Sequence, residues 1–184
     1  MTYKKIDYRY EALLLLLKKE MHGRELAKEL KTSLTRIQCI LNELREYNAI
    51  DYKKEGKNHI YFIKKNLIAK SFILNAENYK LIKLFSKYPY LEPIFNEITQ
   101  KYPNIIIILF GSYAKFIPKE ESDIDIYIET SDKKIKETIQ HINNKLSVKQ
   151  GEFNADDLLI QEIIKNHIII QGGETFYEKL RFFK

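Results

Sequence analysis

The spacing of apolar and polar residues in the first third of the chain predicts three helices. Residues 8–20 form a segment of helix length around five consecutive leucines, and a His-Gly pair at 22–23 ends it. Residues 24–30 fit a short second helix. Ser33 is expected to cap a third helix that ends near Asn48. Apolar residues along this third helix recur at the i, i+3, i+4, i+7 spacing of a buried stripe: Ile37, Ile40, Leu41 and Leu44.

Two extended runs follow the third helix and predict a β-hairpin. They cover residues 50–54 and 59–63, and the turn between them contains Gly56, which tolerates the positive φ that hairpin turns often need. Three helices followed by a hairpin resemble the winged helix-turn-helix domains of prokaryotic transcription regulators. The resemblance covers nearly all of residues 8–63.

The winged-helix resemblance implies that the third helix enters the DNA major groove while the hairpin, or wing, contacts the DNA backbone. The same fold also serves protein contacts and rigid spacing, and that alternative stays open. Helix positions off the apolar stripe can face base edges, and wing lysines suit phosphates. The candidates on the helix are Thr35, Arg36, Gln38, Cys39, Asn42 and Arg45. Those on the wing are Lys53, Lys54, Lys57, Asn58 and His59.

The pattern changes in the rest of the chain. Residues 67–102 predict helices that are separated near Pro89, with no flexible Gly/Ser-rich linker. After Pro103, strand-like and helical runs alternate, which predicts an α/β domain with a mixed sheet. The expected strands are 105–110, 123–129, 145–150 and 167–170, and the expected helices are 111–116, 132–144, 156–166 and 174–182.

The net positive charge lies entirely in the first third of the chain. Residues 1–66 hold 15 Lys and Arg against 9 Asp and Glu, whereas the remaining 118 residues hold 16 of each. This asymmetry favours a polyanionic partner for the N-terminal part, and a basic surface without a partner is the alternative.

Composition also bears on the compartment. The longest apolar stretches, Leu13–Leu17 and Ile105–Phe110, are too short to span a membrane, and no secretion signal is visible. Cys39 is the single cysteine, and it and the four histidines lack the spacing of zinc ligands. We therefore expect a cytoplasmic protein with no membrane partner.

The most informative motif joins a Gly-Ser turn to two aspartates. An apolar run ends at Phe110, Gly111 and Ser112 follow, and ten residues separate Ser112 from Asp123 and the nearby Asp125. Side chains at i and i+2 of a strand lie on one face, so both carboxylates are expected to point to one place. Neighbouring carboxylates repel each other, which indicates a bound cation, and Mg²⁺ suits carboxylates combined with phosphates. A surface turn followed by an acidic edge strand is the alternative.

This motif, at this spacing, resembles that of the nucleotidyltransferase superfamily of the DNA polymerase β type. Ala114 and Ser122 also fit its minimal prokaryotic branch. The resemblance implies attack on the α-phosphate of a nucleoside triphosphate, expected to be ATP, with release of pyrophosphate. Asp123 and Asp125 would hold one or two Mg²⁺ or Mn²⁺ ions. The β- and γ-phosphates would contact Gly111, Ser112 and Lys115, although Lys115 also fits an ordinary surface lysine.

Two positions depart from the pattern of the resembled family. Phe116 stands where the minimal branch usually has a glycine, so its ring either narrows the site or stacks on a base. Active members carry a third carboxylate on a later strand, but residues 145–150 contain no acid, and Ser147 and Lys149 share one face there. Glu152 is the nearest candidate for the third catalytic carboxylate; Asp156 and Asp157 suit a helix start better.

The predicted fold class is α+β. A winged helix of three helices plus a β-hairpin covers residues 1–66, a helical connector covers 67–102, and an α/β nucleotidyltransferase-like domain covers 103–184.

Two functions remain open. The first is a Mg²⁺-dependent transfer of AMP to a protein or nucleic acid, and the minimal branch includes antitoxins that modify a small helical partner ribonuclease. The second is a transcription regulator with a catalytically degenerate domain that binds nucleotide or a partner protein. A homodimer is expected because winged helices often pair.

Overall fold

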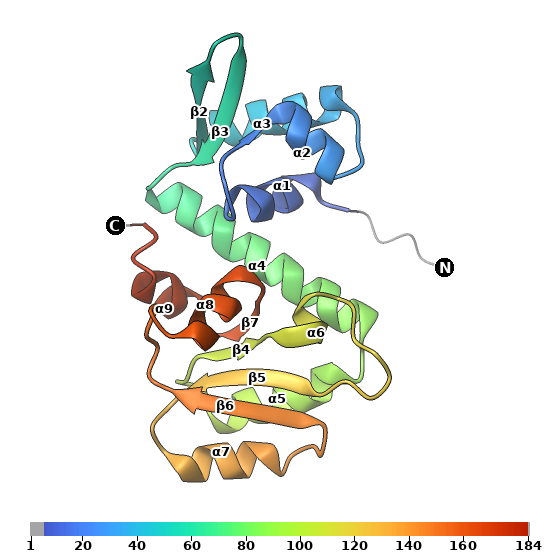
Figure 1. Ribbon diagram of the computed structural model, residues 1–184, viewed down its shortest axis with the longest axis vertical. Helices are drawn as coiled ribbons and strands as arrows, with labels where there is room; N and C mark the ends of the chain where they lie inside the picture. Colours follow the sequence, from blue (N-terminus) through green and yellow to red (C-terminus); the bar gives the residue numbers. More distant parts are fainter. Residues whose placement is uncertain (1–5, 184) are drawn as a thin grey trace. The chain divides into compact units, whose positions relative to one another are not determined.

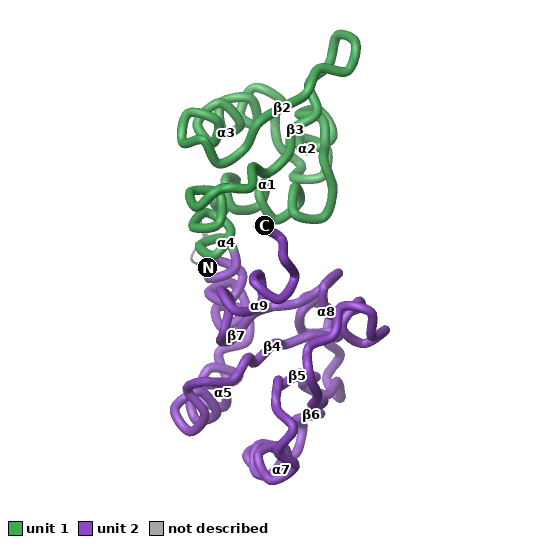
Figure 2. The backbone as a smooth tube through the Cα atoms, turned by 90° about the vertical axis from the view of Figure 1, so that its left-hand side faces the viewer, with its two compact units in different colours: residues 1–76, 183–184 green, residues 77–182 purple. Residues whose placement is uncertain are grey.

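The computed structural model describes residues 6–183 (Figure 1). It divides into two compact units, coloured separately in Figure 2. Unit 1 extends to Ala76 and includes Phe183, and unit 2 covers Glu77–Phe182. In the described residues, no helix is both long and apolar enough to cross a membrane.

Unit 1 has the winged-helix arrangement that the sequence predicts. Its elements are α1 (Tyr8–Leu16), β1 (Met21–His22), α2 (Gly23–Glu29), α3 (Leu34–Glu46), β2 (Ile50–Glu55) and β3 (Asn58–Ile63). The three strands form an antiparallel sheet in the order β1-β3-β2. The three helices and the hairpin are confirmed. The two-residue strand β1 was not predicted, because it is defined by its pairing with Tyr61 and Ile60 rather than by a pattern of its own.

Local signals explain the boundaries of these elements. The Ser33 side chain accepts a hydrogen bond of 3.2 Å from the Arg36 N–H and so caps α3. The predicted stripe of α3 is buried at Ile37, Leu41 and Leu44. The first helix ends at Leu16 instead of residue 20, because the exposed residues 18–20 offer no apolar side chain to bury.

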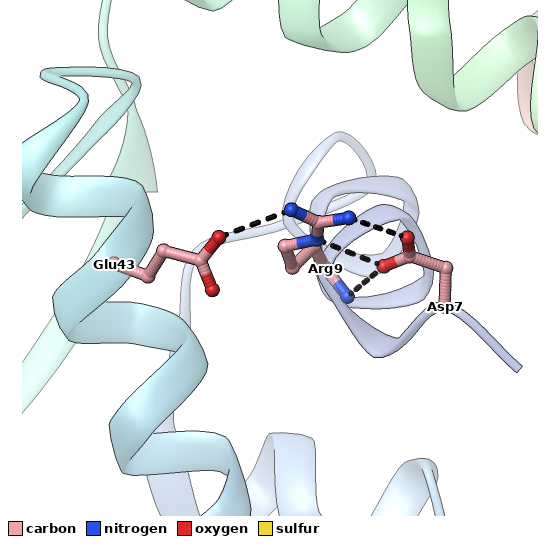
Figure 3. A network of polar contacts seen from close by, with 3 residues as sticks. All are labelled: Asp7, Arg9 and Glu43. Atoms are coloured by element: carbon pink, nitrogen blue, oxygen red, sulfur yellow. Dashed lines mark hydrogen bonds and ion pairs between the residues drawn. The ribbon is translucent and has the colours of Figure 1, made fainter.

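Arg9 connects the start of α1 to α3 (Figure 3). The Asp7 carboxylate caps α1 by accepting from the Arg9 N–H at 3.0 Å, and it also pairs with Arg9 Nη2 at 2.8 Å. Arg9 Nη1 lies 3.0 Å from Glu43 Oε1 on α3. The guanidinium lowers the pKa of Asp7 by hydrogen bonding, against the opposing effect of burial. Because these side chains are partly exposed, their contribution to stability is small.

Two long helices follow the hairpin, as the sequence predicts. They are α4 (Leu67–Lys87) and α5 (Leu91–Lys101), and the break between them contains Pro89. The division between the two units falls inside α4, between Ala76 and Glu77.

Unit 2 contains a four-stranded mixed sheet in the order β6-β5-β4-β7. Its strands are β4 (Ile107–Leu109), β5 (Ile124–Glu129), β6 (Leu146–Gly151) and β7 (Ile168–Gln171). β5 and β6 are parallel, whereas β4 is antiparallel to β5 and to β7. The helices between and after the strands are α6 (Gly111–Ala114), α7 (Lys133–Gln140), α8 (Leu158–Lys165) and α9 (Gly173–Lys179). This order confirms the predicted α/β alternation.

The two faces of this sheet differ in character. On one face Ile124, Ile126 and Ile128 of β5 are buried in a core shared with α4, α5 and α7. The intervening residues Asp125 and Tyr127 lie on the other face, as the period of two requires. The apolar face therefore fixes the strand, and the position of the Asp125 carboxylate follows from it.

Glu77 on α4 is a charged residue in the interior of unit 2, with only 3% of its surface exposed. Its Oε1 accepts a 2.8 Å hydrogen bond from the Tyr177 hydroxyl and lies 3.4 Å from His167 Nε2. Its Oε2 forms a 2.7 Å ion pair with Lys80. Burial alone raises the pKa of Glu77, but the charges of Lys80 and His167 outweigh it and lower the pKa from 4.5 to about 2. The cluster thus ties α4 to α9.

Replacing Glu77 with glutamine (Glu77→Gln) is expected to lower the free energy of unfolding at pH 7 by about 3 kcal/mol, because the buried ion pair is lost. The pKa of Glu77 is lower in the folded than in the unfolded protein. Its contribution is therefore present above about pH 4.5 and is lost as the pH falls towards 2. Urea unfolding followed by circular dichroism at pH 7 and pH 3 measures both effects.

Glu97→Gln on the exposed side of α5 is the matched control, with unchanged stability expected at both pH values. Equal losses for the two variants would contradict the role assigned to Glu77.

Candidate nucleotide-binding site

The site is built around a close contact between Gly111 and Asp125. β4 pairs with β5. The residue after β4 is Phe110, and its N–H donates a 2.9 Å hydrogen bond to the Asp125 carbonyl. Gly111 follows with φ +69°, and a Cβ atom added there would lie 2.3 Å from Asp125 Oδ2. Both the backbone angle and the space require glycine. The turn of the motif therefore packs directly on one of its two aspartates.

The residues after Gly111 anchor the turn in the core. Tyr113 is buried, and its hydroxyl lies 2.9 Å from the Tyr90 hydroxyl. Phe116 has φ +60°, a left-handed conformation that non-glycine residues adopt at a cost of about 1 kcal/mol. A glycine, which the resembled branch usually has at that position, would adopt this angle without that cost.

The Phe116 side chain interacts with lysines of α4. The ammonium groups of Lys83 and Lys87 lie 5.6 and 5.8 Å from its ring centroid. Lys87 Nζ also donates a 2.9 Å hydrogen bond to the Phe116 carbonyl. These contacts hold the strained residue against α4, and Lys83 and Lys87 were not among the predicted site residues.

Asp123 and Asp125 differ in their surroundings. Asp123 is exposed just before β5, whereas Asp125 is partly buried on the strand. Burial raises the pKa of Asp125, and the negative charges of Asp123 and Glu162 add to this shift. A hydrogen bond from Ser147 and the charge of Lys149 oppose it. The Asp125 carboxylate therefore lies within electrostatic reach of Asp123 on one side and of β6 on the other.

Glu152, the predicted third carboxylate, lies beyond the end of β6 and is exposed. Tyr127 lies two residues further along β5 than Asp125. Burial raises the pKa of Tyr127, and the negative charge of Glu152 contributes to this rise. Across residues 6–183, no three Asp, Glu, His or Cys side chains are grouped to hold one metal ion. Asp157 caps α8 by accepting from the Leu159 N–H at 2.7 Å, which agrees with its expected place at a helix start.

Lys115, the predicted phosphate contact, forms a 3.4 Å ion pair with Glu162 of α8. The negative charge of Glu162 also adds to the rise that burial causes in the pKa of Asp125, although Glu162 was not a predicted site residue. The two partners are separated by 47 residues, so no local pattern could have indicated the pair. A phosphate group approaching Lys115 has to compete with this carboxylate.

The donor set suits one hard divalent cation. Two carboxylates at i and i+2, beside a glycine turn that admits close approach, are the kind of ligands that Mg²⁺ takes together with phosphate oxygens. The residues that would hold it are Asp123 and Asp125.

The predicted DNA-binding residues lie on the surface of unit 1. Gln38 and Lys57 line a hollow of about 460 Å³ together with Arg24, which was not predicted. Arg36 lies over the ring of Tyr8 at 5.3 Å, and the Lys53 ammonium pairs with Glu20. The exposed residues among the candidates are Thr35, Arg36, Gln38, Cys39, Asn42, Arg45, Lys53, Lys54, Lys57 and Asn58.

Residues 94–178 match the family model described as polymerase beta, nucleotidyltransferase. This part of the chain is a nucleotidyltransferase-type domain. The matched segment contains every residue predicted for the nucleotide site, from Gly111 to Glu152.

Two solved structures show a slight likeness to the chain. The adhesin competence repressor AdcR from Streptococcus pyogenes is 15% identical, with a TM-score of 0.37 over 55% of this chain and 70% of that one. A variant of ZitR from Lactococcus lactis is 14% identical, with a TM-score of 0.35 over 55% and 65%. A likeness this slight establishes no function. No curated protein matches the chain significantly.

The substitution Gly111→Ala is expected to lower the free energy of unfolding by about 2 kcal/mol and to displace the Asp125 side chain, because the added methyl group occupies its place. Gly151→Ala is the control, since no atom lies within 4 Å of its added Cβ. Urea midpoints of the two variants test this difference. Equal midpoints would show that the turn relaxes without strain.

Proposed function

We propose that this chain is a DNA-binding protein whose nucleotidyltransferase-type domain binds a Mg²⁺–nucleoside triphosphate, with ATP as the expected nucleotide. The observation that carries the proposal is the packing of the Gly111 turn on Asp125. It brings the phosphate-binding and cation-binding halves of the motif together.

The roles of the residues follow from their chemistry. Asp123 and Asp125 would hold the cation, which would supply positive charge to neutralise part of the charge of the phosphates. The backbone at Gly111 and Ser112 and the Ser112 hydroxyl contact the β- and γ-phosphates. Lys115 adds a positive charge beside the phosphates while it stays paired with Glu162.

DNA binding is assigned to unit 1 on the basis of charge and exposure. The excess of positive charge lies in residues 1–66. Gln38 on α3 and Lys57 on the wing border the same hollow, so a base-reading side chain and a phosphate-binding one are close together. A homodimer would place two such surfaces on one DNA duplex.

Two outcomes of nucleotide binding are proposed. The first is transfer of AMP to a protein or nucleic acid, which the complete Gly-Ser and Asp-x-Asp motif favours. A small helical partner protein is one acceptor of this kind. Regulation by a bound nucleotide, without transfer, is favoured by the serine that faces Asp125 from β6.

Nucleotide binding is tested by titration of Mg²⁺–ATP in a calorimeter. Asp125→Asn should weaken binding at least tenfold, because the cation loses a charged ligand. Asp156→Asn, which removes an exposed acid at the start of α8, should bind as the unmodified protein does. Equal affinities for both variants would contradict the assigned site.

Transfer is then tested with α-³²P-labelled ATP, the full-length protein and a lysate of its own organism. Label that appears on a protein or RNA and disappears with Asp125→Asn establishes the transferase. ATP that binds without giving a labelled product supports the second outcome, regulation by a bound nucleotide without transfer.

DNA binding is tested by fluorescence anisotropy with duplex DNA at several salt concentrations. Lys57→Gln should weaken binding to all sequences and reduce the salt dependence by about one counterion. Gln38→Ala should reduce the preference for particular sequences. Lys133→Gln on unit 2 is the control and should change neither property. Identical salt slopes for the Lys57 and Lys133 variants would contradict the proposed wing contact.

A further inference from the structure

The strand beside Asp125 carries a serine and a lysine on the face that holds the carboxylate. We propose that Ser147 and Lys149 restrict the site to one divalent cation for each bound nucleotide. The proposal rests on the nucleotide binding proposed above and specifies how many cations that site holds.

The register of the sheet places these residues. β5 and β6 are parallel, with Asp125 beside Ser147 and Tyr127 beside Lys149. Neighbouring residues of paired strands point to the same face, so Ser147 and Lys149 lie on the face of Asp125. The buried Leu146 and Val148 lie on the opposite face, which fixes this orientation. A one-residue shift would bury Lys149 in the core.

Contacts on this face agree with the register. Burial raises the pKa of the Asp125 carboxyl, and Ser147 and the charge of Lys149 oppose this shift, which agrees with their place beside Asp125 in the sheet. Ser147 therefore occupies the position from which a carboxylate could share a metal ion with Asp125.

The charges present suit one cation. Asp123 and Asp125 together carry two negative charges, which balance one divalent ion. A second ion needs further anionic oxygens from the protein. Ser147 brings no charge and Lys149 brings a positive one. The other nearby acid, Glu162, is paired with Lys115 at 3.4 Å. Throughout residues 6–183, no third acid joins the two aspartates in a metal-binding group.

A site with one cation favours nucleotide retention over transfer. The acceptor hydroxyl must lose a proton as it attacks the α-phosphate, and a second ion or a carboxylate beside Asp125 would promote that loss. A serine hydroxyl in this place does neither.

The number of cations can be counted by equilibrium dialysis of the full chain against Mn²⁺ and the α,β-methylene analogue of ATP. In this analogue a methylene group replaces the oxygen that would leave, so no transfer occurs. The unmodified protein is expected to retain one Mn²⁺ per nucleotide. Ser147→Asp is expected to retain two, and the uncharged control Ser147→Asn one.

A second variant tests the lysine independently. Lys149→Gln should tighten Mn²⁺ binding in the presence of the nucleotide roughly tenfold, because it removes a positive charge near the ion. The ratio should stay at one, and Lys133→Gln should leave the affinity unchanged.

The outcomes separate the two proposals. Two Mn²⁺ per nucleotide in the unmodified protein would overturn the inference while leaving nucleotide binding intact. A ratio of one for a Ser147→Asp protein that still binds nucleotide would overturn the position assigned to Ser147. No retained nucleotide in the unmodified protein would overturn the proposed function itself, together with this inference.

Discussion

The contact between the Gly111 backbone and the Asp125 carboxylate is the constraint on which the candidate site depends. It requires β4 and β5 to pair in one register, a left-handed backbone at Gly111 and no side chain in the space that Asp125 fills. The pairing of the strands meets the first requirement, and glycine at position 111 meets the other two. The site is therefore a property of the sheet rather than of the loop that carries the motif.

The strands are held by the apolar face of the sheet, and the opposite face carries the partly buried Asp125 beside the buried Tyr127. Ile124, Ile126 and Ile128 bury their side chains, and Leu146 and Val148 do the same on the next strand. A shift of either strand by one residue would exchange apolar and polar faces, so hydrophobic burial also fixes where Asp125 and Ser147 lie. Hydrophobic burial thus both stabilises the core and determines which polar side chains face the site.

The functional surfaces of the two units use charge differently. In unit 1 the basic side chains lie on the surface of α3 and the wing, where they can meet a polyanion. In unit 2 two lysines near the site are already engaged, Lys115 with Glu162 and Lys87 with the Phe116 carbonyl.

Apolar periodicity and short-range signals by themselves determined the elements of this protein. The stripe of α3, the Ser33 cap, the hairpin around Gly56 and the alternation after Pro103 depend on neighbours in the sequence, and a single chain displays them. The Gly-Ser and Asp-x-Asp motif likewise predicted a candidate site. Only the tertiary structure decided which residues surround it. The pairing of β5 with β6 put Ser147 beside Asp125 and left Glu152 exposed beyond the strand. Helix packing brought Glu162 to Lys115 and Lys87 to Phe116. These contacts join residues far apart in the chain, and their geometry follows from how the sheet and helices pack together.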